Sequence, residues 1–330
     1  MSTFPLATFD RSSMHWEDYL YSLTPVEKHG PIFLKREDMF APLGSNSING
    51  SQLRQLIWLF LQADRKIDSV TSGAVQGSPQ HAMVSACAKH YGMRCVQFTG
   101  GNGVKKSDMV HIAETFGAEV RYVNPGYAAT LNAKAKALAE AENCLHIQTN
   151  ITVDSPPLLV REFHKVGSEQ VRNIPDHIET LMVPAGSCNS AVSVLYGVSR
   201  FRPRSLKRVI LFGIGSHGSR DPNYVLQRLR VVDPEAAKLF LPCFIHDKEK
   251  EPQVEGFPPY DLIHYNLNGT GFCKYEQMMP FTHWGVELHG RYEAKCFTYM
   301  SRHPKIFEQY MNDRTCFWIV GSQPRASYLG

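Results

Sequence analysis

The stretch N-S-I-N-G-S-Q-L-R-Q-L-I-W, residues 46–58, guides the interpretation of this chain of 330 residues. It opens with asparagine and glycine, which accept tight backbone conformations. It then continues into an expected helix, because apolar residues recur at i, i+3, i+4 and i+7, at Leu53, Leu56, Ile57 and Phe60. Residue 52 therefore lies at a loop-to-helix junction, where a side chain can be presented to a ligand.

Alternating helices and strands follow this stretch. Strands are expected at Ile67–Ser72, Met93–Thr99, Ala118–Val123 and Leu145–Gln148, with helices at 79–91, 104–116 and 128–142. Parallel strands need crossover connections, so this order predicts an open parallel sheet. Residues 51–155 would form a small α/β domain.

A second α/β run is expected on the two sides of that domain. Its strands are Ile32–Lys35, Thr180–Pro184 and Arg208–Gly213, and its helices are Pro157–Val171 and 189–200. Residues 1–50 and 156–330 would form a larger domain. The charged, proline-rich stretch 246–260 is interpreted as a surface loop.

Composition sets the class of protein. Hydrophobic residues make up 43% of the chain and charged residues 20%, as in ordinary globular enzymes. No apolar run is long enough to span a bilayer and the N-terminus lacks a signal pattern, so a cytoplasmic protein without membrane association is expected. Eight cysteines are scattered without metal-ligand spacing, so no metal site is expected. The net charge of +4 does not by itself indicate nucleic-acid binding.

The segment I-F-L-K-R-E-D-M-F-A-P-L-G, residues 32–44, together with G-S-Q-L-R-Q-L, residues 50–56, resembles the active-site entry of type II (tryptophan synthase beta-like) pyridoxal-phosphate enzymes. The likeness is greatest to the aminocyclopropane-carboxylate deaminase and D-cysteine desulfhydrase branch. The resemblance implies two open, mainly parallel, three-layer α/β domains with the cofactor cleft between them, and pyridoxal 5′-phosphate as cofactor. In register with the family's G-N-K-x-R-K-L-E, Gln52 takes the place of the cofactor lysine. An amide cannot form the covalent bond that the lysine amine forms.

The loop T-S-G-A-V-Q-G-S-P-Q-H-A, residues 71–82, resembles the family's S-G-G-x-Q-S-N-H/Q, which covers the cofactor ring. The resemblance implies contacts from Gln76 and Ser78, while Pro79 or Ser78 takes the place of the family's asparagine. The loop follows a predicted strand, where ligands of α/β proteins bind. The alternative is a strand–turn–helix connection in which the glycines serve only the turn.

The segment M-V-P-A-G-S-C-N-S-A-V, residues 182–192, leads from a strand into a helix N-terminus, where backbone N–H groups favour a phosphate. It resembles the family's phosphate loop, G-[ST]-G-G-[ST]. The resemblance implies a phosphate loop at residues 186–190, made of Gly186, Ser187, Cys188, Asn189 and Ser190. Cys188 and Asn189 replace glycines. The alternative is a capped helix without a ligand.

The segment E-L-H-G-R-Y-E-A-K-C-F, residues 287–297, resembles the family's L-D-P-V-Y-[TE]-G-K-A, and C-F-W-I-V-G-S, residues 316–322, resembles a strand ending in T-G-G. The resemblance places Tyr292 and Glu293 on the Tyr-Glu pair and Ser322 beside the cofactor. A carboxylate against the pyridine nitrogen favours its protonated form, which suits deamination, decarboxylation or racemisation. Tyr292 could donate or remove a proton. The alternatives are a half-buried core tyrosine and a solvated carboxylate.

Two further patterns carry less weight. A G-x-G-x-x-G at Gly213, Gly215 and Gly218 follows a strand, but no clean second strand carries the acidic residue that dinucleotide binding needs. The cluster R-F-R-P-R-S-L-K-R, residues 200–208, could contact phosphates or be a solvated helix end.

The resemblance to the type II family implies a pyridoxal-phosphate-dependent lyase or deaminase that acts through a carbanion. Its substrate would be an amino acid or an amino-acid adduct on a larger carrier such as a nucleic acid, and family analogy predicts a homodimer. Gln52 leaves three alternatives open: an enzyme whose lysine has been exchanged, a native lysine-free relative that holds the cofactor non-covalently, and a non-catalytic binding or scaffold protein.

Overall fold

The computed structural model describes residues 19–43, 48–214, 222–244, 259–268, 271–274, 277–280, 282–322 and 324. Contacts divide these residues into two compact units. Unit 1 contains the described part of Phe40–Val153 with Tyr19, Leu20, Ser322 and Pro324, and unit 2 contains that of Tyr21–Met39 and Asp154–Gly321. The predicted boundary at residues 50/51 therefore falls inside unit 1.

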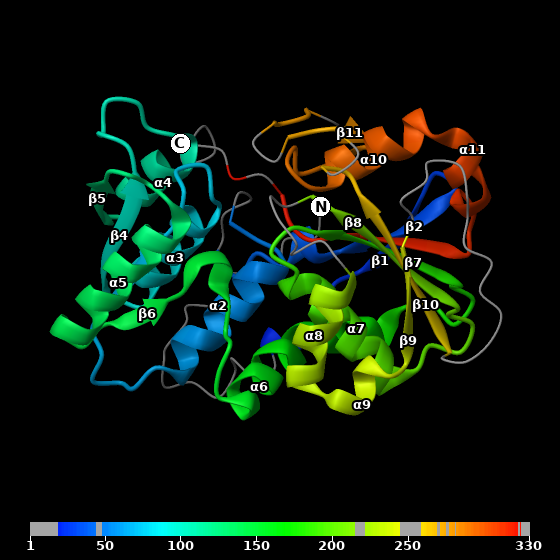
Figure 1. Ribbon diagram of the computed structural model, residues 1–330, viewed down its shortest axis with the longest axis horizontal. Coiled ribbons are helices and arrows are strands. Elements are labelled where there is room, and N and C mark those ends of the chain that lie inside the picture. The colour runs from blue at the N-terminus through cyan, green and yellow to red at the C-terminus, as the bar shows by residue number, and fades with distance from the viewer. Residues whose placement is uncertain are drawn as a thin grey trace. The chain divides into compact units, whose positions relative to one another are not determined.

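Unit 2 is built on a seven-stranded sheet in the order β1-β2-β13-β7-β8-β10-β9. Its strands are β1 (Val26–His29), β2 (Ile32–Arg36), β7 (Thr180–Ala185), β8 (Arg208–Gly213), β9 (Phe240–Phe244), β10 (Tyr260–Asn266) and β13 (Thr315–Ile319). Every pairing is parallel except that of β1 with β2. The last strand, β13, thus lies beside one of the first, and red and blue ribbons are neighbours in Figure 1.

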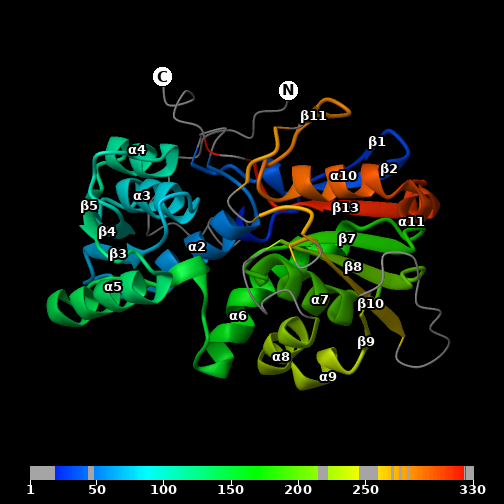
Figure 2. The same cartoon turned by 45° about the horizontal axis from the view of Figure 1, so that its top comes forward.

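Helices cover both faces of this sheet. Figure 2 shows α10 (Glu293–Arg302) and α11 (Pro304–Phe307) on one side, with α7 (Asn189–Phe201), α8 (Pro222–Val232) and α9 (Pro234–Ala237) on the other. Alternate residues of each strand face opposite sides. Met182, Ile210 and Phe317 accordingly pack with Phe297 and Phe307 of the α10–α11 layer in one buried core. Unit 2 also contains α6 (Pro157–Ser168), the two-stranded β11 (Thr282–His283) and β12 (Val286–Glu287), and the 3-10 turns Glu37–Met39, Glu169–Asn173 and Glu308–Tyr310.

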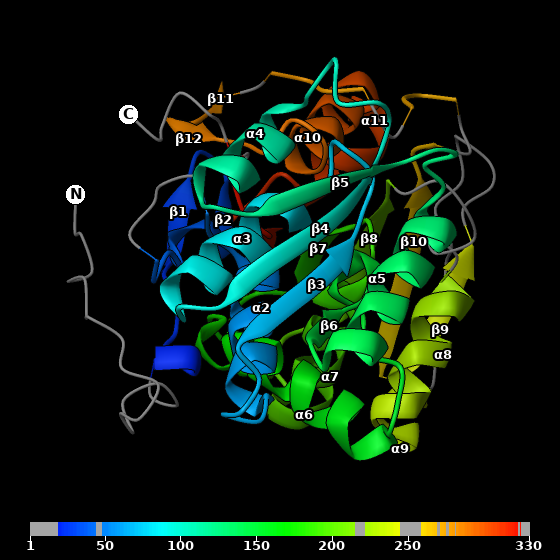
Figure 3. The ribbon, with the colours of Figure 1, turned by 90° about the vertical axis from the view of Figure 1, so that its left-hand side faces the viewer.

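Unit 1 contains a four-stranded parallel sheet in the order β5-β4-β3-β6. The strands are β3 (Ser69–Gly73), β4 (Arg94–Gly100), β5 (Glu119–Val123) and β6 (Leu145–Ile147), and the helices are α2 (Ser51–Gln62), α3 (Gln80–His90), α4 (Asp108–Thr115) and α5 (Ala128–Glu142), followed by a 3-10 turn at Thr149–Ile151. Figure 3 shows α5 on one side of the sheet and α3 and α4 on the other. Val96 and Phe98 pack against Leu131 and Ala135 of α5.

The predicted α/β class with parallel sheets is confirmed in both units. The largest shift is at the N-terminus of α4, expected at 104 and found at Asp108. Ser107 explains this start, because its side chain accepts a hydrogen bond from the Val110 N–H and caps the helix. Residues 245–258, Gly215 and Gly218 lie outside the described residues. No helix in the described segments combines the length and apolar character needed to cross a membrane.

Candidate active site

The predicted phosphate loop, residues 186–190, joins the carboxyl end of β7 to the N-terminus of α7. The first N–H groups of a helix lack intrahelical partners and carry partial positive charge, so they can receive a phosphate. Cys188, the N-cap residue, has φ +68°, a left-handed conformation that costs a non-glycine residue energy. The glycine that the family has here would not carry that cost.

Arg228 of α8 forms hydrogen bonds with this loop. Its guanidinium donates one hydrogen bond to the Ser187 carbonyl at 2.8 Å and another to Oδ1 of Asn189 at 2.7 Å. Both acceptors belong to the phosphate loop. The cation therefore fixes the loop's shape and adds positive charge to the helix N-terminus.

Tyr292 lies directly against this loop. A β-carbon built on Gly186 would lie 2.6 Å from Cε1 of Tyr292, closer than any real contact. Only glycine at position 186 leaves room for the ring. Two predicted site segments, 182–192 and 287–297, are thus brought together within unit 2.

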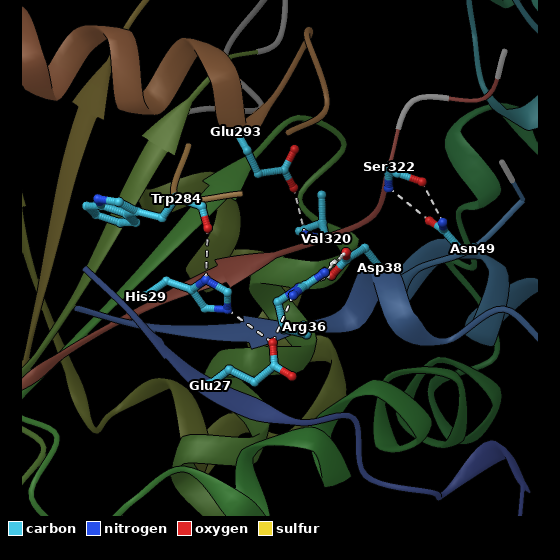
Figure 4. Close-up of polar contacts among 9 residues, drawn as sticks. All are labelled: Glu27, His29, Arg36, Asp38, Asn49, Trp284, Glu293, Val320 and Ser322. Atoms are coloured by element: carbon cyan, nitrogen blue, oxygen red, sulfur yellow. Dashed lines mark hydrogen bonds and ion pairs between the residues drawn. The ribbon is translucent and has the colours of Figure 1, made fainter. Parts of the chain in front are cut away.

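Glu293 follows Tyr292 as the first residue of α10, and its side chain is fully buried. Its Oε1 accepts a hydrogen bond from the Val320 N–H at 2.7 Å (Figure 4). Its Oε2 has no hydrogen-bond partner among the described residues. Burial raises the pKa of this carboxyl to about 8. The alternative in which Glu293 is a solvated carboxylate is wrong.

Charge repulsion from Asp38 also raises the pKa of Glu293, to a smaller extent than burial does. The Asp38 carboxylate is held by Arg36 at 2.7 Å, and Arg36 also bonds Glu27 at 2.8 Å (Figure 4). Glu27 in turn bonds Nε2 of His29 at 3.1 Å. This chain of contacts, from β1 through the end of β2 to the turn that follows it, fixes the position of the Asp38 carboxyl group.

In unit 1, Gln52 is the second residue of α2 and is half-buried. The helix is preceded by Gly50, whose φ of +96° suits glycine. Asn49 accepts a hydrogen bond from the Ser322 N–H at 2.8 Å, and its amide also donates to the Ser322 hydroxyl (Figure 4). These bonds hold Ser322 against Asn49, which precedes Gln52 by three residues in the sequence.

The predicted ring-covering loop connects β3 to α3. Ser78 accepts a hydrogen bond from the Gln80 N–H at 3.3 Å, so its hydroxyl contributes to the start of α3. The side-chain amide of Gln76 donates to the Gly100 carbonyl at 2.7 Å, and the backbone carbonyl of Gln76 accepts from the Ser107 hydroxyl. Gln76 therefore ties this loop to the one after β4. A cofactor contact from Gln76 or Ser78 stays a prediction.

The side chains of unit 2 fit pyridoxal phosphate. The unpartnered Oε2 of Glu293 can accept a hydrogen bond from the protonated nitrogen of a pyridine ring. Because Glu293 is buried, water is excluded from that contact. The helix N-terminus at Asn189 and the Arg228 cation suit the phosphate. That Gln52, which lacks an amine, takes the place of the cofactor lysine stays a prediction.

Sequence reasoning missed two residues of this region. Arg228 belongs to no motif and reaches the phosphate loop only through the packing of α8 beside α7. His289 lies inside the quoted segment 287–297, but its burial is a property of the fold. An exposed arginine or histidine gives the same sequence signal as a buried one.

Comparisons with known proteins show what this chain is similar to. The family model described as "Pyridoxal-phosphate dependent enzyme" matches residues 19–238. The "O-seryl-dTMP PLP-dependent decarboxylase" of Salmonella phage ViI is 34% identical over 374 residues, covering 97% of this chain and 86% of that protein. The tryptophan synthase beta chain of Acinetobacter calcoaceticus is 27% identical over 209 residues, covering 58% of this chain and 50% of that protein.

Solved structures share the fold. A homologue of aminocyclopropane-carboxylate deaminase has a TM-score of 0.61 at 15% identity, covering 94% of this chain and 95% of that one. Processed threonine deaminase isoform 2 from Solanum lycopersicum has a TM-score of 0.57 at 13% identity, covering 96% and 87%. At sequence identities this low, the similarity shows a shared fold and nothing about function.

Proposed function

Because the chain belongs to the family of pyridoxal-phosphate-dependent enzymes, we propose that it decarboxylates an amino acid carried on a nucleotide. Likeness to the phage decarboxylase along 97% of the chain supports this substrate class. The observation that carries the proposal is the buried Glu293 carboxyl with its unpartnered oxygen. A group so placed suits a reaction with a fully developed carbanion, as decarboxylation is.

When bound, pyridoxal phosphate supplies an electron sink for the pair left by the departing CO₂. The residues of the chain would hold and orient it. The phosphate loop, held in place by Arg228, would bind the phosphate, and Glu293 would hold a proton at the pyridine nitrogen. Burial of Glu293 keeps water from that bond and strengthens it.

The carbon that loses CO₂ must next receive a proton. We assign this step to the Tyr292 hydroxyl, since its ring lies against Gly186 and its neighbour is Glu293. Tyr292→Phe keeps the packing against Gly186 and removes the hydroxyl. The variant should bind cofactor normally and release product slowly.

For Gln52 we propose the non-covalent alternative. Gln52→Lys tests it, because a lysine there would create a cofactor bond that borohydride reduces. The expected result is a yellow, reducible species in the variant and none in the parent protein. If the parent protein also gives a reducible product, another lysine is the anchor. If the variant gives none, residue 52 does not face the cofactor.

Decarboxylation itself is tested with O-seryl-dTMP labelled at its carboxyl carbon. Purified protein supplemented with pyridoxal phosphate should release labelled CO₂, and Glu293→Gln should release it far more slowly. Free L-serine serves as the control substrate and should give little CO₂. No release from either substrate contradicts the proposal and favours the scaffold alternative.

A homodimer and a cytoplasmic location are part of the same proposal, supported by analogy with the family and by composition. Analytical ultracentrifugation and cell fractionation measure these two properties.

A further inference from the structure

His289 is a buried imidazole with a defined tautomer. Its side chain follows β12 and is only 3% exposed. Nδ1 accepts a hydrogen bond from the Arg291 N–H at 3.1 Å. A nitrogen that accepts such a bond carries no proton, so in the neutral ring the proton is on Nε2.

That Nε2–H has no hydrogen-bond partner among the described residues. Buried donors are nearly always paired, because a lost hydrogen bond with water is costly. Burial and, to a lesser degree, the cations of Arg291 and Lys295 lower the pKa of His289 to about 3. The ring therefore stays neutral at physiological pH, where it can donate a hydrogen bond but does not act as an acid.

The ring lies beside the candidate active site. Its centroid is 4.7 Å from that of Tyr292, and the Tyr292 ring touches the position of Gly186. Arg291 and Lys295 are both at least nine-tenths buried in the same segment. A donor in such positive surroundings matches an anionic acceptor.

We propose that the Nε2–H of His289 donates a hydrogen bond to an oxyanion of the substrate, its carboxylate or its phosphate. This proposal rests on the proposed function and adds a residue that determines substrate specificity. Because the ring is neutral, it orients the oxyanion through one hydrogen bond and adds no positive charge of its own to those of Arg291 and Lys295. The pattern L-D-P-V-Y that segment 287–297 resembles has an aspartate at this place, which could not donate when ionised.

Two substitutions of His289 distinguish the role of Nδ1 from the role of Nε2. In His289→Asn the amide oxygen can still accept from the Arg291 N–H, but the side chain is too short to replace Nε2. In His289→Gln the amide N–H reaches the place of Nε2. If the donor matters, the Asn variant should lose affinity roughly 10- to 100-fold and the Gln variant should recover most of it.

The test uses protein loaded with pyridoxal phosphate and calorimetric titration of three probes: L-serine, dTMP and thymidine. If the acceptor is the phosphate, His289→Asn weakens dTMP binding and leaves L-serine unchanged. If it is the carboxylate, L-serine binding weakens and dTMP is unchanged. Thymidine, which has neither oxyanion, should bind all three proteins equally.

Cofactor content and melting temperature of each variant are measured alongside. His289→Asn binding every probe as the parent does, with cofactor retained, overturns the inference and leaves the proposed function standing. Equal losses in the Asn and Gln variants also overturn it, because they indicate a packing role. If the parent protein binds neither L-serine nor dTMP, both proposals fail.

Discussion

Gly186 and Tyr292 are in contact although they come from distant segments, and a β-carbon on Gly186 would lie 2.6 Å from the tyrosine ring. The contact joins the phosphate loop to the N-terminus of α10, where Glu293 is buried. The proposed phosphate site and the proposed partner of the pyridine nitrogen therefore belong to one compact unit.

Gly186→Ala should weaken cofactor binding, because the added methyl must displace Tyr292 or the phosphate loop. Overpacking of this kind costs about 1–3 kcal/mol, so the dissociation constant of pyridoxal phosphate should rise roughly tenfold or more. Titration followed by absorbance measures it. Adding Tyr292→Ala removes the obstructing ring, and the double variant should regain cofactor affinity. No recovery in the double variant would place the cause elsewhere.

Arg228→Gln should loosen the phosphate loop, since two hydrogen bonds from a cation to Ser187 and Asn189 are lost. Bonds of this kind contribute about 1.5–3 kcal/mol, so affinity for the cofactor should fall about tenfold or more. Arg230→Gln, an exposed position on the same helix, is the matched control. Equal affinities of the two variants would show that Arg228 does not support phosphate binding.

Cys188→Gly and Cys188→Ala together measure the cost of the left-handed conformation at φ +68°. Both remove the thiol, but only glycine removes the clash of Cβ with the backbone. The glycine variant should have the higher free energy of unfolding, by about 1 kcal/mol. Urea denaturation measures the difference, and equal stabilities would mean that the turn carries no such cost.

The raised pKa of Glu293 should make the stability of the cofactor-free protein depend on pH. Its carboxyl has a pKa of about 8 when folded, above the ordinary value of 4.5. Between these values the folded protein binds more protons than the unfolded chain, so the free energy of unfolding falls as pH rises from 4.5 to about 8. The fall is at most about 1.4 kcal/mol per pH unit.

Glu293→Gln should remove this part of the slope, while Glu308→Gln, at an exposed carboxyl of the same unit, should leave it in place. Urea denaturation across the pH range compares the three proteins. Parallel curves for Glu293→Gln and the parent would show that the pKa of the buried carboxyl is not raised above its ordinary value of 4.5.

Much of the fold could be predicted from the sequence because local pattern and final structure agree. Helix α5 and strand β8 have the predicted bounds, and β3 to β6 differ by a few residues at most. Strands β9 and β10 and helix α8 were missed, although the buried residues Val225, Leu226, Leu229 and Val232 of α8 recur with helical spacing. The start of α4 depended on the Ser107 cap, which the preceding glycines and lysines obscured.

By itself, the sequence determined the fold class, the family and the segments that could carry chemistry, because these depend on hydrophobic periodicity and on short motifs in a given order. Tertiary structure alone decided that Tyr292 contacts Gly186, that Arg228 holds the phosphate loop, and that Glu293 and His289 are buried with an unpartnered atom each among the described residues. Burial and pairing arise when distant segments pack, and they set the pKa and the open hydrogen-bonding positions that chemistry uses.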